Sequence, residues 1–156
     1  MVIKFFPAEE YQLKYRKSKD GAIDFFRENT KESNVLATVI TGKRFIGIVN
    51  NEIFKVISSE VGIGAFCVFS GVLVNDGCNL KVEINKPFKI LLCIISLMMP
   101  LAIVIQLIVS PGWQNIGLIV PLSMFIVIGR FILKFMFKQS LNLGFSKLNS
   151  IFVLES

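Results

Sequence analysis

Between Val35 and Asn85 the hydrophobic and polar positions follow the short period of β-strands. Apolar and β-branched residues concentrate in five segments, which are 35–40, 44–49, 52–58, 63–74 and 78–85. The sequences Asn50-Asn51 and Asn75-Asp76-Gly77 separate neighbouring segments with residues that favour tight turns. Segment 63–74 is apolar on both faces, which is typical of a central strand. The pattern predicts an antiparallel meander of four or five strands.

The first 32 residues predict two short strands and one helix. Val2–Phe6 has strand composition, and the alternation of apolar residues over 11–15 suggests a second strand or an extended edge. Two glutamates precede that alternation and would also suit the start of a helix. Over Asp20–Glu32 the apolar residues recur at helical spacing, and the Asp20 carboxylate can cap the helix by accepting from its first amides. One short amphipathic helix is therefore available to cover the sheet.

The longest pattern is Ile90–Gly129, forty residues (129 − 90 + 1) without a charged side chain. A single helix of that length would run roughly 60 Å, twice the hydrocarbon core of a bilayer. Ser110-Pro111-Gly112 interrupts the stretch near its middle with residues that end helices. We therefore predict a two-helix transmembrane hairpin with spans of about 90–109 and 116–133, in which Pro100 produces a mild kink or a hinge.

Basic residues flank the two predicted spans, and Trp113 lies in the loop between them. After the second span the basic residues recur every four positions, which places them on one face of a helix that leaves the membrane. We predict that Trp113 anchors the far interface and that five basic residues contact lipid headgroups, namely Lys86, Lys89, Arg130, Lys134 and Lys138. A second cluster, Lys14-Arg16-Lys17-Lys19, suits either headgroup contact or a solvated edge.

The net charge of +6 comes almost entirely from the membrane region. Residues 1–83 carry eleven basic and ten acidic side chains, whereas residues 84–156 carry six basic side chains and only Glu155 as an acid. Positive charge beside the spans predicts a multi-pass protein of the bacterial inner membrane with both termini in the cytoplasm. The balanced charge of residues 1–83 argues against a nucleic-acid partner, because such a protein needs a basic face on its soluble part.

The C-terminal residues predict an amphipathic helix. Apolar residues recur there at intervals of three or four, at Leu141, Phe145, Leu148 and Phe152. Gly144 weakens this helix, which can lie on the membrane or pack back on the meander. The expected fold class is an α+β membrane protein: an N-terminal antiparallel β-meander with one short helix, a two-helix transmembrane hairpin and a C-terminal amphipathic helix. The corresponding parts are a cytoplasmic β-rich domain (1–85), the hairpin (86–138) and the amphipathic segment (139–156).

The composition argues against most catalytic chemistry. The chain contains no histidine, which removes His-based general bases, Ser-His-Asp and Cys-His triads and most zinc sites. Neither a glycine-rich phosphate loop nor Cys-x-x-Cys occurs, so we expect no cofactor, no metal and no enzymatic activity. Cys67, Cys78 and Cys93 favour buried thiols in a reducing compartment over a disulfide framework.

A resemblance rests on Phe45-x-Gly47-x-Val49, followed by Phe54-x-Val56, a long apolar strand, a return strand and two spans. This organisation resembles small uncharacterised bacterial membrane proteins and, more loosely, the bacterial PH-like and YcxB-like membrane proteins. The resemblance implies a small β-domain coupled to two spans and assigns no functional residue. We expect a non-enzymatic integral membrane protein whose membrane-apposed β-domain binds lipid headgroups, a protein partner or a second copy of the chain. The alternative is an immunity or accessory protein that neutralises a membrane-acting toxin.

Overall fold

The structure is a computed structural model that describes residues 6–16, 18–109 and 116–154. The predicted strand Val2–Phe6 falls outside these ranges except for Phe6, and so do the predicted helix break at 110–112 and the interface anchor Trp113. The chain forms two compact units. Residues 1–85 and 136–156 make up the β-rich unit, and residues 86–135 make up the apolar unit.

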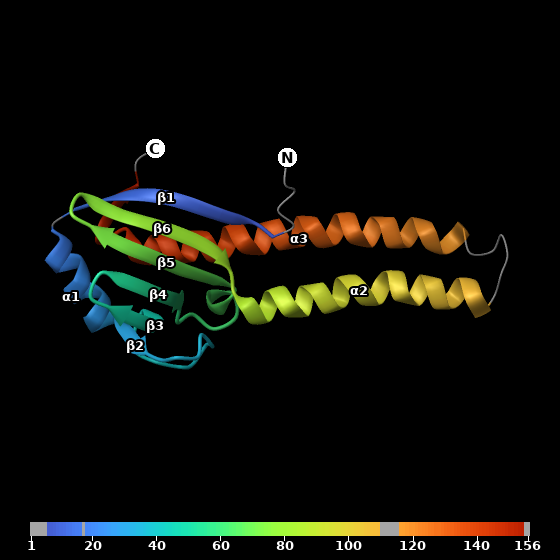
Figure 1. Cartoon of the computed structure of the whole chain (residues 1–156), viewed down its shortest axis with the longest axis horizontal. Helices are drawn as coiled ribbons and strands as arrows, with labels where there is room; N and C mark the ends of the chain where they lie inside the picture. Colours follow the sequence, from blue (N-terminus) through green and yellow to red (C-terminus); the bar gives the residue numbers. More distant parts are fainter. Residues whose placement is uncertain (1–5, 17, 110–115, 155–156) are drawn as a thin grey trace. The chain divides into compact units, whose positions relative to one another are not determined.

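The β-rich unit is built on one seven-stranded sheet (Figure 1). Its elements are β1 (Ala8–Tyr15), α1 (Lys19–Asn29), β2 (Thr30–Glu32), β3 (Phe45–Asn50), β4 (Ile53–Ser58), the 3-10 turn η1 (Ile63–Ala65), β5 (Cys67–Val74), β6 (Gly77–Ile84) and β7 (Phe152–Leu154). Helix α2 (Lys86–Val109) lies in the apolar unit, and helix α3 (Ile116–Leu148) begins there and ends in the β-rich unit. The strand order is β2-β3-β4-β5-β6-β1-β7, in which β2 and β3 are parallel and the other neighbours are antiparallel.

Strands β3 to β6 form the four-stranded antiparallel meander that the turn residues predict. Asn50 pairs with Ile53, so the first hairpin closes through a two-residue turn in which Asn51 has a φ of +42°. Asparagine tolerates this left-handed conformation better than most residues. The alternation along β6 is also as predicted, with Leu80, Val82 and Ile84 buried and Lys81 exposed.

The predicted fold class is wrong about the sheet, which is mixed and larger than a meander. Strand β2 pairs in parallel with β3, while β1 and β7 extend the sheet beyond β6. These pairings join distant parts of the chain, as where Leu13 meets Leu154. Strand pairing across such distances depends on the register and on the buried face of the whole sheet, so no local pattern predicts it.

Residues 35–40 form no strand, although their composition predicts one. They lie in the irregular connection between β2 and β3. A strand must satisfy its backbone groups by pairing with a neighbour, and β2, not residues 35–40, is the segment that pairs with β3. The apolar side chains of this connection are therefore left outside the sheet.

Helix α1 contributes Phe26 to the centre of the core. The Phe26 side chain has no exposed surface, and its ring stacks on that of Phe54 with a centroid distance of 4.2 Å. The helix is capped by Ser18, whose Oγ accepts from the Gly21 amide at 3.2 Å. The prediction that Asp20 caps the helix is wrong, because Asp20 lies in the first turn of α1. There its negative charge interacts favourably with the positive end of the helix dipole.

Helix α3 continues onto the sheet without a break. From Met136 it belongs to the β-rich unit, where its buried side chains are Phe137, Ser140, Leu141 and Leu148. Gly144 lies so close to the sheet that an added Cβ would be 1.9 Å from Cζ of Phe69. Of the two predicted alternatives for the apolar face at 139–156, the structure shows packing on the sheet. The helix is not separate, because it is the end of α3, and it stops at Leu148 before β7.

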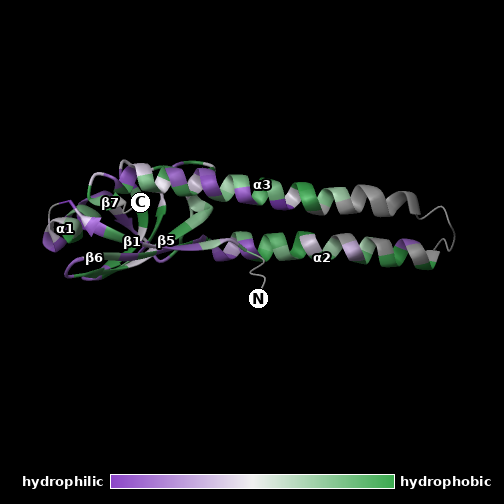
Figure 2. Ribbon diagram, turned by 90° about the horizontal axis from the view of Figure 1, so that it is seen from above, coloured by the Kyte–Doolittle hydropathy of each residue, from purple (hydrophilic) through white to green (hydrophobic). Residues whose placement is uncertain are grey.

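The predicted two-helix transmembrane hairpin is also wrong. Among the described residues, Lys86–Gln106 is the one helical stretch long and apolar enough to cross a bilayer, at 21 residues. In α3 the uncharged part before Arg130 has only fourteen residues (129 − 116 + 1), about 21 Å of helix, which is shorter than the hydrocarbon core. Helix α2 also begins earlier than the predicted span, at Lys86. Figure 2 shows the hydrophobic colour along much of α2, and none of the stretch that could cross a bilayer is buried within the chain.

Candidate functional site

One end of the sheet, which we name the exit rim, consists of the connections 33–44 and 59–66 and of Asn85 (Figure 1). The strand register brings these parts together, because Phe45 pairs with Ser58 and Cys67 pairs with Ile84. The β3–β4 and β5–β6 turns lie at the opposite end, separated from the exit rim by strands of six to eight residues, about 20–26 Å. Since α2 begins directly after Asn85, the chain leaves the β-rich unit at the exit rim.

Asn85 holds the exit rim together. Its backbone amide donates to the Phe66 carbonyl at 2.9 Å, and its side-chain Nδ2 donates to the carbonyls of Leu36 at 2.9 Å and Ala65 at 3.1 Å. The residue is only 4% exposed, so these bonds replace the water that its amide groups lost on folding. Both connections of the exit rim are thereby tied to the residue that precedes α2.

The exit rim exposes apolar side chains that the fold does not cover. The exposed fraction is 68% for Val35, 46% for Val39, 90% for Ile40 and 73% for Val61. The connection 33–44 contains no acidic residue and ends in the basic pair Lys43 and Arg44. Apolar side chains with adjacent basic residues are the combination that binds membrane interfaces.

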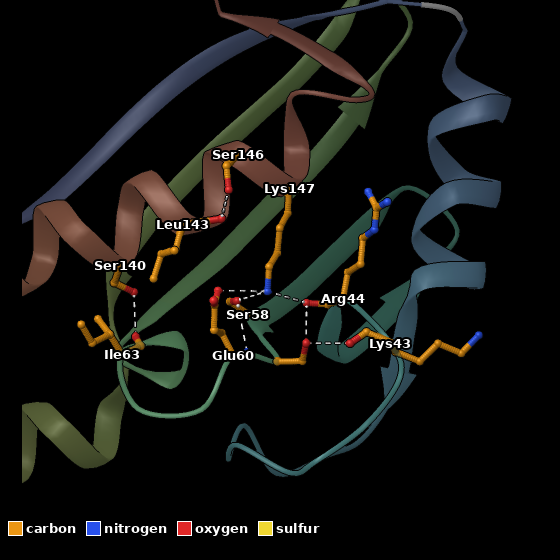
Figure 3. A network of polar contacts seen from close by, with 10 residues as sticks. Lys43, Arg44, Ser58, Glu60, Ile63, Ser140, Leu143, Ser146 and Lys147 are labelled. Atoms are coloured by element: carbon orange, nitrogen blue, oxygen red, sulfur yellow. Dashed lines mark hydrogen bonds and ion pairs between the residues drawn. The ribbon is translucent and has the colours of Figure 1, made fainter.

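Lys147 ties the end of α3 to the exit rim (Figure 3). Its ammonium donates to Ser58 Oγ at 2.6 Å and to the Arg44 carbonyl at 3.4 Å, and it pairs with the Glu60 carboxylate at 3.5 Å. A serine beside a lysine can act as a nucleophile with its base. However, Ser58 has no exposed surface, and a substrate cannot reach its hydroxyl. The cluster therefore has a structural role: it links the end of α3 to the exit rim.

Replacing Lys147 with methionine should lower the free energy of unfolding of the β-rich unit by about 1–2 kcal/mol, because two acceptors at the exit rim lose a charged donor. Glu60→Gln is the control and should cost less than about 0.5 kcal/mol, since this side chain is 49% exposed and its ion pair is screened by water. Labelling of the buried Cys67 thiol in rising denaturant measures both values. Equal losses in the two variants would contradict a tie made through Ser58 and Arg44.

The structure places the five predicted headgroup residues on two helices. Lys86 and Lys89 lie in the first turn of α2, where Lys86 is exposed and Lys89 is half-buried. Arg130, Lys134 and Lys138 lie on α3, and all three are exposed. Their spacing of four residues puts them on one helical face, with Lys138 in the β-rich unit and the other two in the apolar unit.

In the second basic cluster, two of the described residues contact neighbouring side chains, and Lys17 lies outside the described residues. Lys19 pairs with Glu52 at 2.5 Å, and Arg16 donates from its guanidinium to Asn149 Oδ1 at 3.1 Å. Both contacts lie near the end of β1 that is remote from the exit rim. Two of these basic side chains are therefore engaged by neighbours on the protein surface.

The cysteines carry no evident reactivity within the β-rich unit. Cys67 and Cys78 are buried, and burial raises the pKa of the Cys67 thiol to about 11 and that of the Cys78 thiol to about 12. Both thiols stay protonated at neutral pH, which suppresses their nucleophilic reactivity. Cys93 differs from the prediction of three buried thiols, because it is exposed on α2. All three cysteines are free.

Two surface hollows lie along β1 and β6. The larger one, of about 530 Å³, lies over the β1–β6 pair and is lined by Glu10, Tyr11, Gln12, Asn79, Leu80 and Lys81. In the part of the chain that the structure describes, no cluster of three or more histidine, cysteine or acidic residues could hold a metal ion. The exit rim is therefore the candidate site with the clearest physical character.

Sequence reasoning missed the exit rim because it assigned 35–40 to a strand and gave Asn85 no role. One signal was available: a run of β-branched residues without charges between Ser33 and Gly42, in a region whose neighbouring strands already account for the meander. The contact between Asn85 and Leu36 joins residues 49 positions apart and could only be seen in the folded chain.

No protein-family model, curated protein or solved structure matches this chain. The resemblance to small bacterial membrane proteins with a β-rich domain therefore stays a prediction, and the proposals below rest on the chain's own residues.

Proposed function

We propose that this chain is a non-enzymatic membrane protein that is anchored by α2 and presents its β-rich unit to lipid headgroups. The observation that carries the proposal is the exposed apolar surface of α2. Ten large apolar side chains between Ile90 and Ile108 are 42–75% exposed. Leaving them in water would cost on the order of 10 kcal/mol, which is comparable to the total stability of a domain. A lipid environment removes this cost.

The charges beside α2 support an orientation. Lys86 and Lys89 occupy the first turn of the helix, and its remaining residues carry no charge. Basic residues beside a membrane-embedded segment favour the cytoplasmic side. Residues 136–156 fold into the same unit as residues 1–85, so the proposal requires the chain after α2 to return to the side of the membrane on which α2 begins. The proposal therefore places the β-rich unit in the cytoplasm, at the level of the headgroups.

Leu97→Lys combined with Leu101→Lys tests the anchor. Each lysine near the middle of α2 should oppose insertion by about 3 kcal/mol, so the double variant should lose at least tenfold in the fraction that stays with membranes after alkaline carbonate extraction. The matched control adds two lysines to exposed positions of the β-rich unit, Asn79→Lys and Asn142→Lys, and should stay with the membrane. Extraction of the unaltered protein by carbonate would refute the anchor.

Orientation has its own measurement. A phosphatase reporter that is active only outside the cytoplasm should be inactive when it is fused after Ser156, and strong activity would overturn the proposed side.

The immunity or accessory role remains the alternative proposal. It predicts a stoichiometric protein partner that co-purifies with the full chain, whereas headgroup binding predicts co-purifying phospholipid.

A further inference from the structure

We propose that the exposed apolar part of the exit rim, Val35, Val39, Ile40 and Val61, inserts into the interfacial layer of the same membrane that holds α2. This inference rests on the proposed function, since it requires α2 to be embedded in lipid. It assigns a role to the connection between β2 and β3 as a membrane-inserting loop. The occupant of this surface is the boundary between lipid headgroups and acyl chains.

Connectivity sets the depth of the exit rim. Asn85 is bound to Leu36 and Ala65 of the rim, and α2 starts at the next residue. The uncharged part of α2 begins at Ile90, four residues (90 − 86) after the helix start, which is about 6 Å of helix. One headgroup layer of a bilayer is about 5–8 Å thick. The loop tied to Asn85 therefore lies at headgroup level when Ile90 enters the hydrocarbon.

The chemistry of the rim fits that depth. Exposed β-branched side chains suit the acyl boundary, and the absence of acidic residues from 33–44 avoids repulsion by anionic headgroups. Lys43 and Arg44 close the connection and are exposed; the Lys43 ammonium donates to the Glu28 carbonyl, and the Arg44 guanidinium lies over the Phe25 ring. The one acid of 59–66, Glu60, pairs with Lys147. The opposite end of the sheet carries polar turns instead, at Asn51-Glu52 and Asn75-Asp76.

Other apolar residues are exposed on the sheet, and they provide the control. Ile53 is 60% exposed, but it begins β4 beside the β3–β4 turn, at the end of the sheet remote from the exit rim. Ile53 is separated from Asn85, the residue before α2, by the length of the sheet, whereas Ile40 belongs to a connection that Asn85 binds. Ile40 and Ile53 are therefore a matched pair: both are exposed isoleucines, and only Ile40 lies on the exit rim.

The test uses the full chain with Cys93→Ala, so that no exposed native thiol remains among the three cysteines. A single new cysteine, Ile40→Cys or Ile53→Cys, is labelled with an environment-sensitive nitrobenzoxadiazole fluorophore. The protein is reconstituted in vesicles of one part phosphatidylglycerol and three parts phosphatidylethanolamine. Bromine-labelled acyl chains quench probes in the lipid, and iodide quenches probes in water. We expect at least threefold more quenching by brominated lipid at position 40 than at position 53, with iodide showing the opposite preference.

Vesicle flotation separates this inference from the proposed function. Protein that floats with the vesicles but is quenched by iodide equally at both positions has an embedded α2 and an aqueous loop, which overturns the insertion alone. A probe at position 40 that neither quencher reaches is covered by protein, and this result also overturns insertion. Protein that does not float refutes the membrane anchor and, with it, the loop proposal.

Discussion

Alanine in place of Gly144 should lower the free energy of unfolding of the β-rich unit by about 1–3 kcal/mol. In an isolated helix the same change would raise stability by roughly 1 kcal/mol, because alanine has the higher helix propensity. Here the added Cβ would lie 1.9 Å from Cζ of Phe69. Phe69 has no exposed surface, so its ring cannot turn aside into solvent. The steric clash therefore makes Gly144→Ala destabilising, although helix propensity alone would make it stabilising.

The measurement is the rate at which Cys67 and Cys78 react with a maleimide in rising denaturant, with the full chain in detergent micelles. In the folded state, burial and the raised pKa of both thiols suppress this reaction. Gly129→Ala is the matched control in the same helix, because an added Cβ there meets no described atom within 4 Å. It should leave stability unchanged or raise it by up to about 1 kcal/mol, as helix propensity predicts. A Gly144→Ala protein as stable as the parent would refute the contact between α3 and Phe69.

Phe26→Ala should have the larger effect, a loss of about 3–5 kcal/mol that leaves much of the β-rich unit unfolded at room temperature. The ring stacks on Phe54 at 4.2 Å between centroids and lies 6.0 Å from Phe45 and 6.3 Å from Phe152. It thereby joins α1 to β3, β4 and β7. Removing it leaves a cavity among elements that come from both ends of the chain.

Phe25→Ala is the control for Phe26, because it removes the same ring from the next position of α1. Phe25 is half-exposed, and its ring contacts the Arg44 guanidinium, 5.7 Å from the ring centroid, and the Phe26 ring, at 6.1 Å between centroids. Its loss should cost about 1 kcal/mol. Thermal unfolding followed by far-ultraviolet circular dichroism ranks the two variants. A similar midpoint for both would contradict the central position of Phe26.

Local patterns predicted the elements that depend on neighbouring residues. The hairpins of the meander close at Asn51 and at Asn75-Asp76, and the preference of these residues for turns belongs to their own backbone and side chains. Helix α2 likewise follows from a run of apolar residues, whatever its surroundings. The same reasoning failed at 35–40, because β-branched composition does not report whether a strand edge is free for pairing.

The sequence did not predict the exit rim, although it predicted the basic residues that follow it. Lys86 and Lys89 were identified from their position beside an apolar run, and they lie at the start of α2. The exit rim escaped prediction, since it depends on Asn85 reaching Leu36 and on β2 occupying the edge of β3. Gly144 was interpreted as a weakness of a helix, whereas the fold uses its missing side chain to bring α3 against Phe69.

By itself the sequence determined the hairpins of the meander, the apolar helix that follows them and the absence of histidine chemistry. Only the tertiary structure decided that the sheet is mixed, that α3 ends on the sheet and that an apolar loop is exposed at the end of the sheet where Asn85 lies. The physical reason is the range of the interactions. Turn preference and helix composition act over a few residues, whereas the pairing of Leu13 with Leu154 joins positions 141 residues apart (154 − 13) and forms only when the whole core packs.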